Sequence, residues 1–128
     1  MDKQAFSSPD APAPIGPYSP AITWGDLVLL SGTGPRDSKT GKLESQDIAQ
    51  QTRQALANIE SLLQAAGSSK NQVLKVTVYL TDIKNFETMN AIYKEFFAGT
   101  TFPARTTLQV AALPGGIGIE LDVIAARK

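Results

Sequence analysis

Two short, mainly apolar runs near the N-terminus predict two strands joined by a tight turn. The apolar runs at residues 22–24 and 27–31 flank Gly25 and Asp26, a turn-forming pair. Before them, residues 1–20 hold five of the eight prolines. Proline lacks an amide hydrogen and breaks helices, so we expect an extended arm here. Residues 32–41 are rich in Gly, Pro, Asp, Ser and Thr, which is typical of a loop.

Two later segments have the apolar spacing of amphipathic helices. In residues 47–66 the apolar stripe comprises Ile48, Thr52, Ala55, Leu56, Ile59, Leu62, Leu63 and Ala66. Ser45 can cap the start of this helix and Gly67 can end it. A second helix follows the capping residue Asp82 and stops before Gly99, with an inner face marked by Phe86, Met89, Ile92 or Tyr93, and Phe96. Both helices need another layer to cover these stripes.

Three more segments read as strands. Residues 74–80 alternate, with Leu74, Val76, Val78 and Leu80 on one face and Lys75, Thr77 and Tyr79 on the other. Residues 105–110 and 117–125 are also strand-like, and they are separated by the turn-rich stretch 113–116. We expect these last two strands to form a hairpin.

The predicted order of elements indicates a single α+β domain over residues 1–128, with a mixed sheet and two helices packed on one face. The other sheet face then needs a cover. It would carry residues that are neither fully apolar nor charged: Thr77, Tyr79, Thr107 and Gln109. Packing against further copies of the chain is a common way to bury such a face, so we expect a homo-oligomer.

Composition narrows the chemistry. The chain of 128 residues has 12 Lys+Arg against 12 Asp+Glu and contains neither histidine nor cysteine. Imidazole bases, thiolate nucleophiles, disulfides and ordinary zinc sites are therefore excluded. Balanced, scattered charge argues against nucleic-acid binding. No apolar run is long enough to span a bilayer and the first residues do not form a secretory signal, so we expect a cytoplasmic protein with no membrane partner.

Four places could still carry chemistry. Tyr18 lies in a stiff Gly-Pro loop, and Ser31-Gly32 directly follows a strand, where backbone groups can approach a ligand. Arg105 follows a proline at the start of a strand, and its planar guanidinium suits a carboxylate. Glu120 alternates with apolar residues, and burial by another subunit would raise its pKa and make it a candidate acid or base. Each residue also has an ordinary structural interpretation.

The register of the expected hairpin decides whether one chain can bring Arg105 and Glu120 together. If Thr107 lies opposite Glu120, then Arg105 is on the same sheet face, one diagonal step away. A shift of one residue moves Glu120 to the other face.

In this order and spacing, the motifs resemble those of the RidA family, also called YjgF or L-PSP, the reactive-intermediate deaminases. The resemblance runs from about residue 14 to the C-terminus. Its main stretches are IGPYS at 15–19, SG at 31–32, AAG at 65–67, VLKVTVYL at 73–80, FPAR at 102–105, and LP at 113–114 followed by IE at 119–120. Asn90 and Tyr93 also match.

The resemblance implies a chorismate-mutase-like subunit and a homotrimer with sites between subunits. It also implies hydrolysis of enamines and imines released by pyridoxal-phosphate dehydratases, such as 2-iminobutanoate, to 2-oxo acids and ammonium. No metal or other cofactor is needed, because an imine carbon is already electrophilic. Arg105 would bind the substrate carboxylate and Glu120 would handle the attacking water. Other implied pocket residues are Tyr18, Ser31, Gly32, Asn90 and Thr107.

Two departures from the family pattern bear on pocket shape. This chain has Thr33-Gly34-Pro35 where many deaminases have Gln-Ile-Pro, and Thr107 where many have cysteine. Two other functions stay open at this point. One is the endoribonuclease or translation-inhibitor activity that the name L-PSP carries, and the other is a non-enzymatic small-molecule binder or chaperone.

Overall fold

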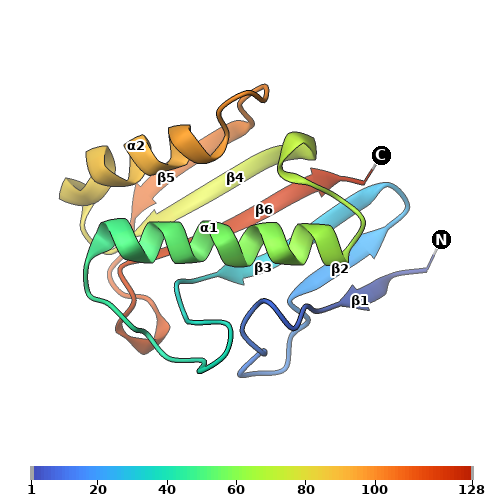
Figure 1. The fold of residues 1–128 in the computed structure, drawn as a ribbon, viewed down its shortest axis with the longest axis horizontal. Coiled ribbons are helices and arrows are strands. Elements are labelled where there is room, and N and C mark those ends of the chain that lie inside the picture. The colour runs from blue at the N-terminus through green and yellow to red at the C-terminus, as the bar shows by residue number, and fades with distance from the viewer. Residues whose placement is uncertain (1, 128) are drawn as a thin grey trace.

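A six-stranded sheet forms one layer of the molecule and two helices form the other (Figure 1). The computed structural model describes residues 2–127. The strands are β1 (Gln4–Phe6), β2 (Ala21–Trp24), β3 (Leu27–Thr33), β4 (Val73–Leu80), β5 (Ala104–Gln109) and β6 (Ile119–Ala126). The helices are α1 (Ile48–Ala65) and α2 (Phe86–Phe96), with short 3₁₀ turns η1 (Lys70–Gln72), η2 (Ile83–Asn85) and η3 (Pro114–Gly116). The mixed α+β fold predicted from the sequence is confirmed.

The strand order is β1-β2-β3-β6-β4-β5, so β6 lies between β3 and β4. The pair β4–β5 is parallel and the other pairs are antiparallel. The prediction that the last two strands, β5 and β6, form a hairpin is therefore wrong. The chain does reverse its direction at η3. After this turn, however, it crosses to the other side of β4, and β6 pairs with β4 and β3 instead of with β5. The four core residues of β6 are almost completely buried, which suits a central strand: Ile119, Leu121, Val123 and Ala125.

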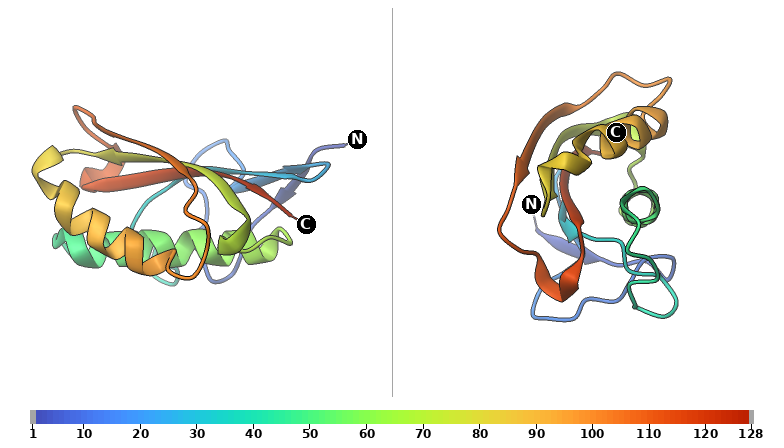
Figure 2. Two further views of the ribbon diagram at one scale, coloured as in Figure 1. Left: turned by 90° about the horizontal axis from the view of Figure 1, so that it is seen from above. Right: turned by 90° about the vertical axis from the view of Figure 1, so that its left-hand side faces the viewer.

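Both helices pack on the same face of the sheet, as expected (Figure 2). The stripe of α1 predicted from periodicity lies in the core, including Ala55, Leu56, Ile59 and Leu63. The N-cap is Asp47, whose carboxylate accepts from the Gln50 amide at 3.1 Å, rather than Ser45. At the other end, Gly67 has a φ of 82°, the left-handed conformation that ends helices.

The distribution of residues between the two faces differs from the prediction at two places. On β4 a register shift lies between Val73 and Lys75, so Val73 enters the core and Leu74 is 50% exposed. On β5, Arg105 is paired with the core residue Val76. Arg105, Thr107 and Gln109 therefore face the helices, and Thr107 and Gln109 do not share a face with Thr77 and Tyr79.

The sheet face away from the helices carries both polar and apolar groups. Tyr79 donates to the Asp122 carboxylate at 2.7 Å, and Lys75 donates to the Thr106 hydroxyl at 2.8 Å. Large apolar side chains lie exposed on the strands that form this face: Trp24, Leu27, Leu29, Leu108 and Ile124. Within residues 2–127, neither helix has the length and apolar character needed to cross a membrane.

Candidate functional site

A β-bulge on β3 shapes the floor of the main cavity. Leu30 is paired with Val123 and Thr33 with Leu121, so Ser31 and Gly32 together oppose one residue of β6. The bulge brings the Gly32 backbone against the Glu120 side chain. A Cβ added at Gly32 would lie 2.7 Å from Glu120 Oε2. Glycine is therefore required here for the carboxylate to occupy its position.

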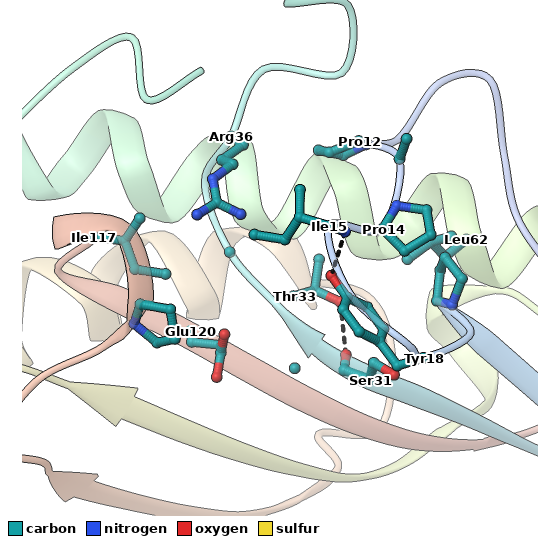
Figure 3. A pocket seen from close by; sticks show the side chains of 15 residues that line it. Pro12, Pro14, Ile15, Tyr18, Ser31, Thr33, Arg36, Leu62, Ile117 and Glu120 are labelled. Carbon is teal, nitrogen blue, oxygen red and sulfur yellow. Dashed lines mark hydrogen bonds between the residues drawn. The ribbon is translucent and has the colours of Figure 1, made fainter. Parts of the chain in front are cut away.

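The proline-rich loop before β2 forms a wall of this cavity. Ser31 Oγ donates to the Ser19 carbonyl at 2.7 Å, which fastens the loop to the bulge. Tyr18 is 46% exposed, and its hydroxyl accepts from the Ile15 amide at 3.5 Å. The Tyr18 ring and the Glu120 carboxylate line one pocket (Figure 3). The volume of this pocket is about 340 Å³. Four residues predicted for the site, Tyr18, Ser31, Gly32 and Glu120, are thus brought together.

Arg36 lines the same cavity, and the sequence interpretation missed it. Its backbone is held from α1, because the buried Asn58 amide donates to the carbonyls of Gly34 at 3.0 Å and Arg36 at 2.9 Å. Its guanidinium packs against Gly115 of η3 and is directed into the pocket toward the Glu120 side (Figure 3). Arg36 lies in a loop without regular spacing, so no periodic signal could have identified it.

The Glu120 carboxylate is in an environment that favours its protonated form. Burial raises the pKa of Glu120, the nearby Asp122 charge raises that pKa further, and the Arg36 guanidinium opposes both effects. The expected effect of burial on this pKa is therefore already present within one chain.

Arg105 belongs to a second cluster, at the β5 edge of the sheet and beside α2. Its guanidinium carbon lies 4.7 Å from the ring centre of Tyr93 and 5.6 Å from that of Phe86. Asn90 is on the same side of α2, because it is one turn from each of these aromatic residues. Thr107 is two residues beyond Arg105 on the same face of β5.

Two hydroxyl groups in this second cluster are buried without a hydrogen-bond partner among residues 2–127: Tyr93 Oη and Thr107 Oγ1. Burial raises the pKa of Tyr93 to about 12, although the adjacent Arg105 charge acts in the opposite direction. Buried polar atoms are nearly always hydrogen-bonded in native proteins, so this cluster is incomplete in the isolated chain.

The two clusters lie on opposite faces of the sheet. Arg105 is paired with Val76, which points to the helices, whereas Glu120 is paired with Tyr79, which points away from them. The register with Thr107 opposite Glu120 does not occur, since β5 and β6 are not neighbours. One chain therefore cannot place Arg105 and Glu120 on the same small ligand.

Comparison with known proteins identifies the family. The model of the family described as Endoribonuclease L-PSP matches residues 8–127. A RutC family protein of Pyrococcus horikoshii is 46% identical, with 98% of this chain and 99% of the relative covered. The 2-iminobutanoate/2-iminopropanoate deaminase of Escherichia coli K12 is 39% identical, with 98% of each chain covered.

A solved structure agrees with this assignment. The crystal structure of a Yersinia pestis protein of the conserved Rid family, described as of unknown function, superposes with a TM-score of 0.95 at 43% identity. The match covers 98% of this chain and 99% of the other. The chain therefore belongs to the L-PSP family, also known as RidA or YjgF, which its motifs predicted.

Proposed function

We propose that the protein is a metal-independent imine deaminase that acts as a homotrimer on 2-iminobutanoate and 2-iminopropanoate. The observation that carries the proposal is the separation of Glu120 and Arg105 on opposite sheet faces. Each cluster holds half of what imine hydrolysis needs, and a second copy of the chain can supply the missing half. The Escherichia coli relative that bears this activity in its name is similar over nearly the whole chain.

The proposed reaction needs three tasks from the protein. Arg105 binds the substrate carboxylate with its two parallel N–H groups and so fixes the imine carbon. Glu120 accepts a proton from water as the water oxygen bonds to that carbon. Glu120 passes that proton to the imine nitrogen, and the second water proton moves from the new hydroxyl group to the nitrogen as the C–N bond breaks. The nitrogen leaves as ammonia, and the oxygen remains as the carbonyl of the 2-oxo acid. Tyr18, Ser31, Gly32, Asn90 and Thr107 would line the site.

Two features of the isolated chain support assembly. The sheet face away from the helices exposes large apolar side chains such as Trp24, Leu29 and Ile124, and such surfaces commonly mark subunit contacts. The orphan hydroxyls of Tyr93 and Thr107 also need partners.

The direct test couples the purified protein to a threonine dehydratase in the presence of semicarbazide. Semicarbazide traps the imine, so a deaminase lowers the initial rate of semicarbazone formation and speeds release of 2-oxobutanoate. We expect this effect with the wild-type protein and its loss in Glu120→Gln. No acceleration by the wild-type protein would overturn the proposal. Cleavage of RNA that is lost in Arg105→Ala would favour the endoribonuclease alternative.

A mixing experiment tests whether the site lies between subunits. Arg105→Ala and Glu120→Gln are each expected to be inactive alone. In co-expressed mixed trimers, an Arg105 from one subunit can meet a Glu120 from another. Random assembly of equal amounts should restore about a quarter of wild-type activity. Co-expression of wild type with the double variant, Arg105→Ala with Glu120→Gln, shows whether subunits mix at random. If subunits mix but the two single variants recover no activity together, the site lies within one chain.

A further inference from the structure

We infer that Arg36 is a specificity-determining residue that binds a second carboxylate, so that dicarboxylic 2-imino acids are the preferred substrates. This inference rests on the proposed function, because it places the imine between Glu120 and the Arg105 of another subunit. Arg36 is the cationic residue that lines the Glu120 cavity itself, and none of the tasks in the proposed reaction uses it.

The surroundings of Arg36 leave its charge available for a ligand. Among residues 2–127, no carboxylate lies within salt-bridge distance of its guanidinium, and the ion pair that the structure shows is Lys70–Glu60, on the far side of α1. Apolar side chains border Arg36 in the pocket, notably Ile15 and Ile117 (Figure 3). A half-buried guanidinium with apolar neighbours gains more from an anion than a solvated one does, because less water competes for it.

The position of Arg36 is fixed before any ligand arrives. Asn58 is fully buried and holds the Gly34 and Arg36 carbonyls, while the Gln54 side chain donates to the Asn58 oxygen at 2.9 Å. A backbone anchored in this way lowers the entropic cost of binding through Arg36. The guanidinium packs against Gly115 and is directed into the cavity (Figure 3).

Cavity size and charge agree with a longer, doubly charged substrate. A pocket of about 340 Å³ offers more room than a three-carbon imine fills. A substrate with one carboxylate, bound to Arg105, would leave Arg36 unpaired and Glu120 close to the reacting carbon. A side-chain carboxylate at the other end of the substrate would pair with Arg36 and leave the imine carbon between the two anchors. The fitting substrates are the imines of acidic amino acids, 2-iminosuccinate and 2-iminoglutarate.

The test compares two classes of imine made in place by flavin amino-acid oxidases. Oxidation of aspartate or glutamate supplies the dicarboxylic imines, and oxidation of alanine supplies 2-iminopropanoate, with semicarbazide trapping as the readout. We expect wild-type kcat/KM to favour the dicarboxylic imines. In Arg36→Met this preference should fall by about tenfold to a hundredfold, the usual effect of removing a charge-assisted contact. Arg53→Met, an arginine in the outer groove between α1 and α2, is the matched control and should keep the wild-type preference.

A binding measurement separates this inference from the proposed function. Calorimetry should show tighter binding of 2-oxoglutarate than of 2-oxobutanoate, with the difference lost in Arg36→Met. Activity on 2-iminopropanoate without any dicarboxylate preference would overturn the role of Arg36 and leave the deaminase proposal standing. Equal losses on both substrate classes in Arg36→Met would also overturn it, since Arg36 would then act only through the charge on Glu120. Inactivity on every imine would instead defeat the proposed function.

Discussion

The Glu120 cavity and the Arg105 cluster are built on different structural principles. The cavity forms where a bulge, a proline-rich loop and the η3 turn converge, and its carboxylate rests on the bare backbone of Gly32. The Arg105 cluster forms on regular elements, an edge strand and one helix, and its guanidinium lies beside two aromatic rings. Irregular backbone thus forms the Glu120 cavity, whereas the regular spacing of a strand and a helix forms the Arg105 cluster.

This difference predicts how each of these two regions responds to mutation. The cavity depends on close backbone approach, so small additions of volume should disturb it. The Arg105 cluster depends on ring faces and on one charged side chain, so removal of these groups should disturb it.

The largest effect is expected from Arg105→Ala. Loss of the carboxylate anchor should lower kcat/KM for 2-iminobutanoate about 30-fold or more, because a charge-assisted pair contributes about 2 kcal/mol to transition-state binding. The matched control Arg53→Ala should retain full activity. Wild-type kinetics in Arg105→Ala would show that the Arg105 cluster does not bind the substrate.

A slightly smaller effect is expected from Gly32→Ala. The added Cβ would meet the Glu120 carboxylate at 2.7 Å and displace it. We expect kcat to fall about tenfold, since small misplacements of a base are costly. The unfolding temperature should hardly change, because Gly32 has no left-handed φ. Gly16→Ala, which adds only an ordinary contact with the Tyr18 ring, provides the comparison.

The pH dependence should report the environment of Glu120. Because its pKa is raised, the acidic limb of kcat/KM should lie above the pH expected for an ordinary glutamate. Arg36→Met removes the charge that opposes this shift, so the limb should move to still higher pH. The folded chain binds this proton more tightly than the unfolded chain, so stability falls as pH rises between the two pKa values. Glu120→Gln should therefore raise the melting temperature at neutral pH.

The smallest effect is expected at Tyr93. Tyr93→Phe keeps the ring beside Arg105 and removes a buried hydroxyl without a partner in the described chain. In the proposed trimer this hydroxyl gains a partner from a second subunit, so the free energy of unfolding should fall by about 0.5–1 kcal/mol, with little change in activity. Tyr93→Leu removes the ring and should raise KM several-fold more than it lowers kcat. Stabilisation by Tyr93→Phe would mean that the hydroxyl stays without a partner in the assembled protein.

Periodicity was enough to predict both helices and most strands, because amphipathic stripes such as that of α1 pack directly on the sheet. It could not place β6 between β3 and β4. The turn residues at η3 predict only that the chain reverses its direction. Which strands become the neighbours of β6 depends on tertiary packing, because those strands must share its buried apolar face. The short strand β1 was also missed, since its three residues carry too little pattern.

The candidate site was predictable to a similar extent. Motifs identified Tyr18, Ser31, Gly32 and Glu120, which the fold brings together, and also Arg105, which the fold places on the opposite face. The sequence did not predict Arg36 as a site residue, because its location depends on a hydrogen bond from Asn58, which is far from it in the chain.

That contact from α1 has a consequence for how such a protein can diversify. The helix holds the loop by its carbonyl oxygens, which every amino acid possesses, so the identity of the side chain at position 36 is not needed to keep the loop in place. Under the role inferred for Arg36, substitutions there would alter which molecules are accepted while the scaffold stays as it is, and they would also shift the pKa of Glu120. Position 36 is thus a site where new substrate ranges could be acquired one mutation at a time.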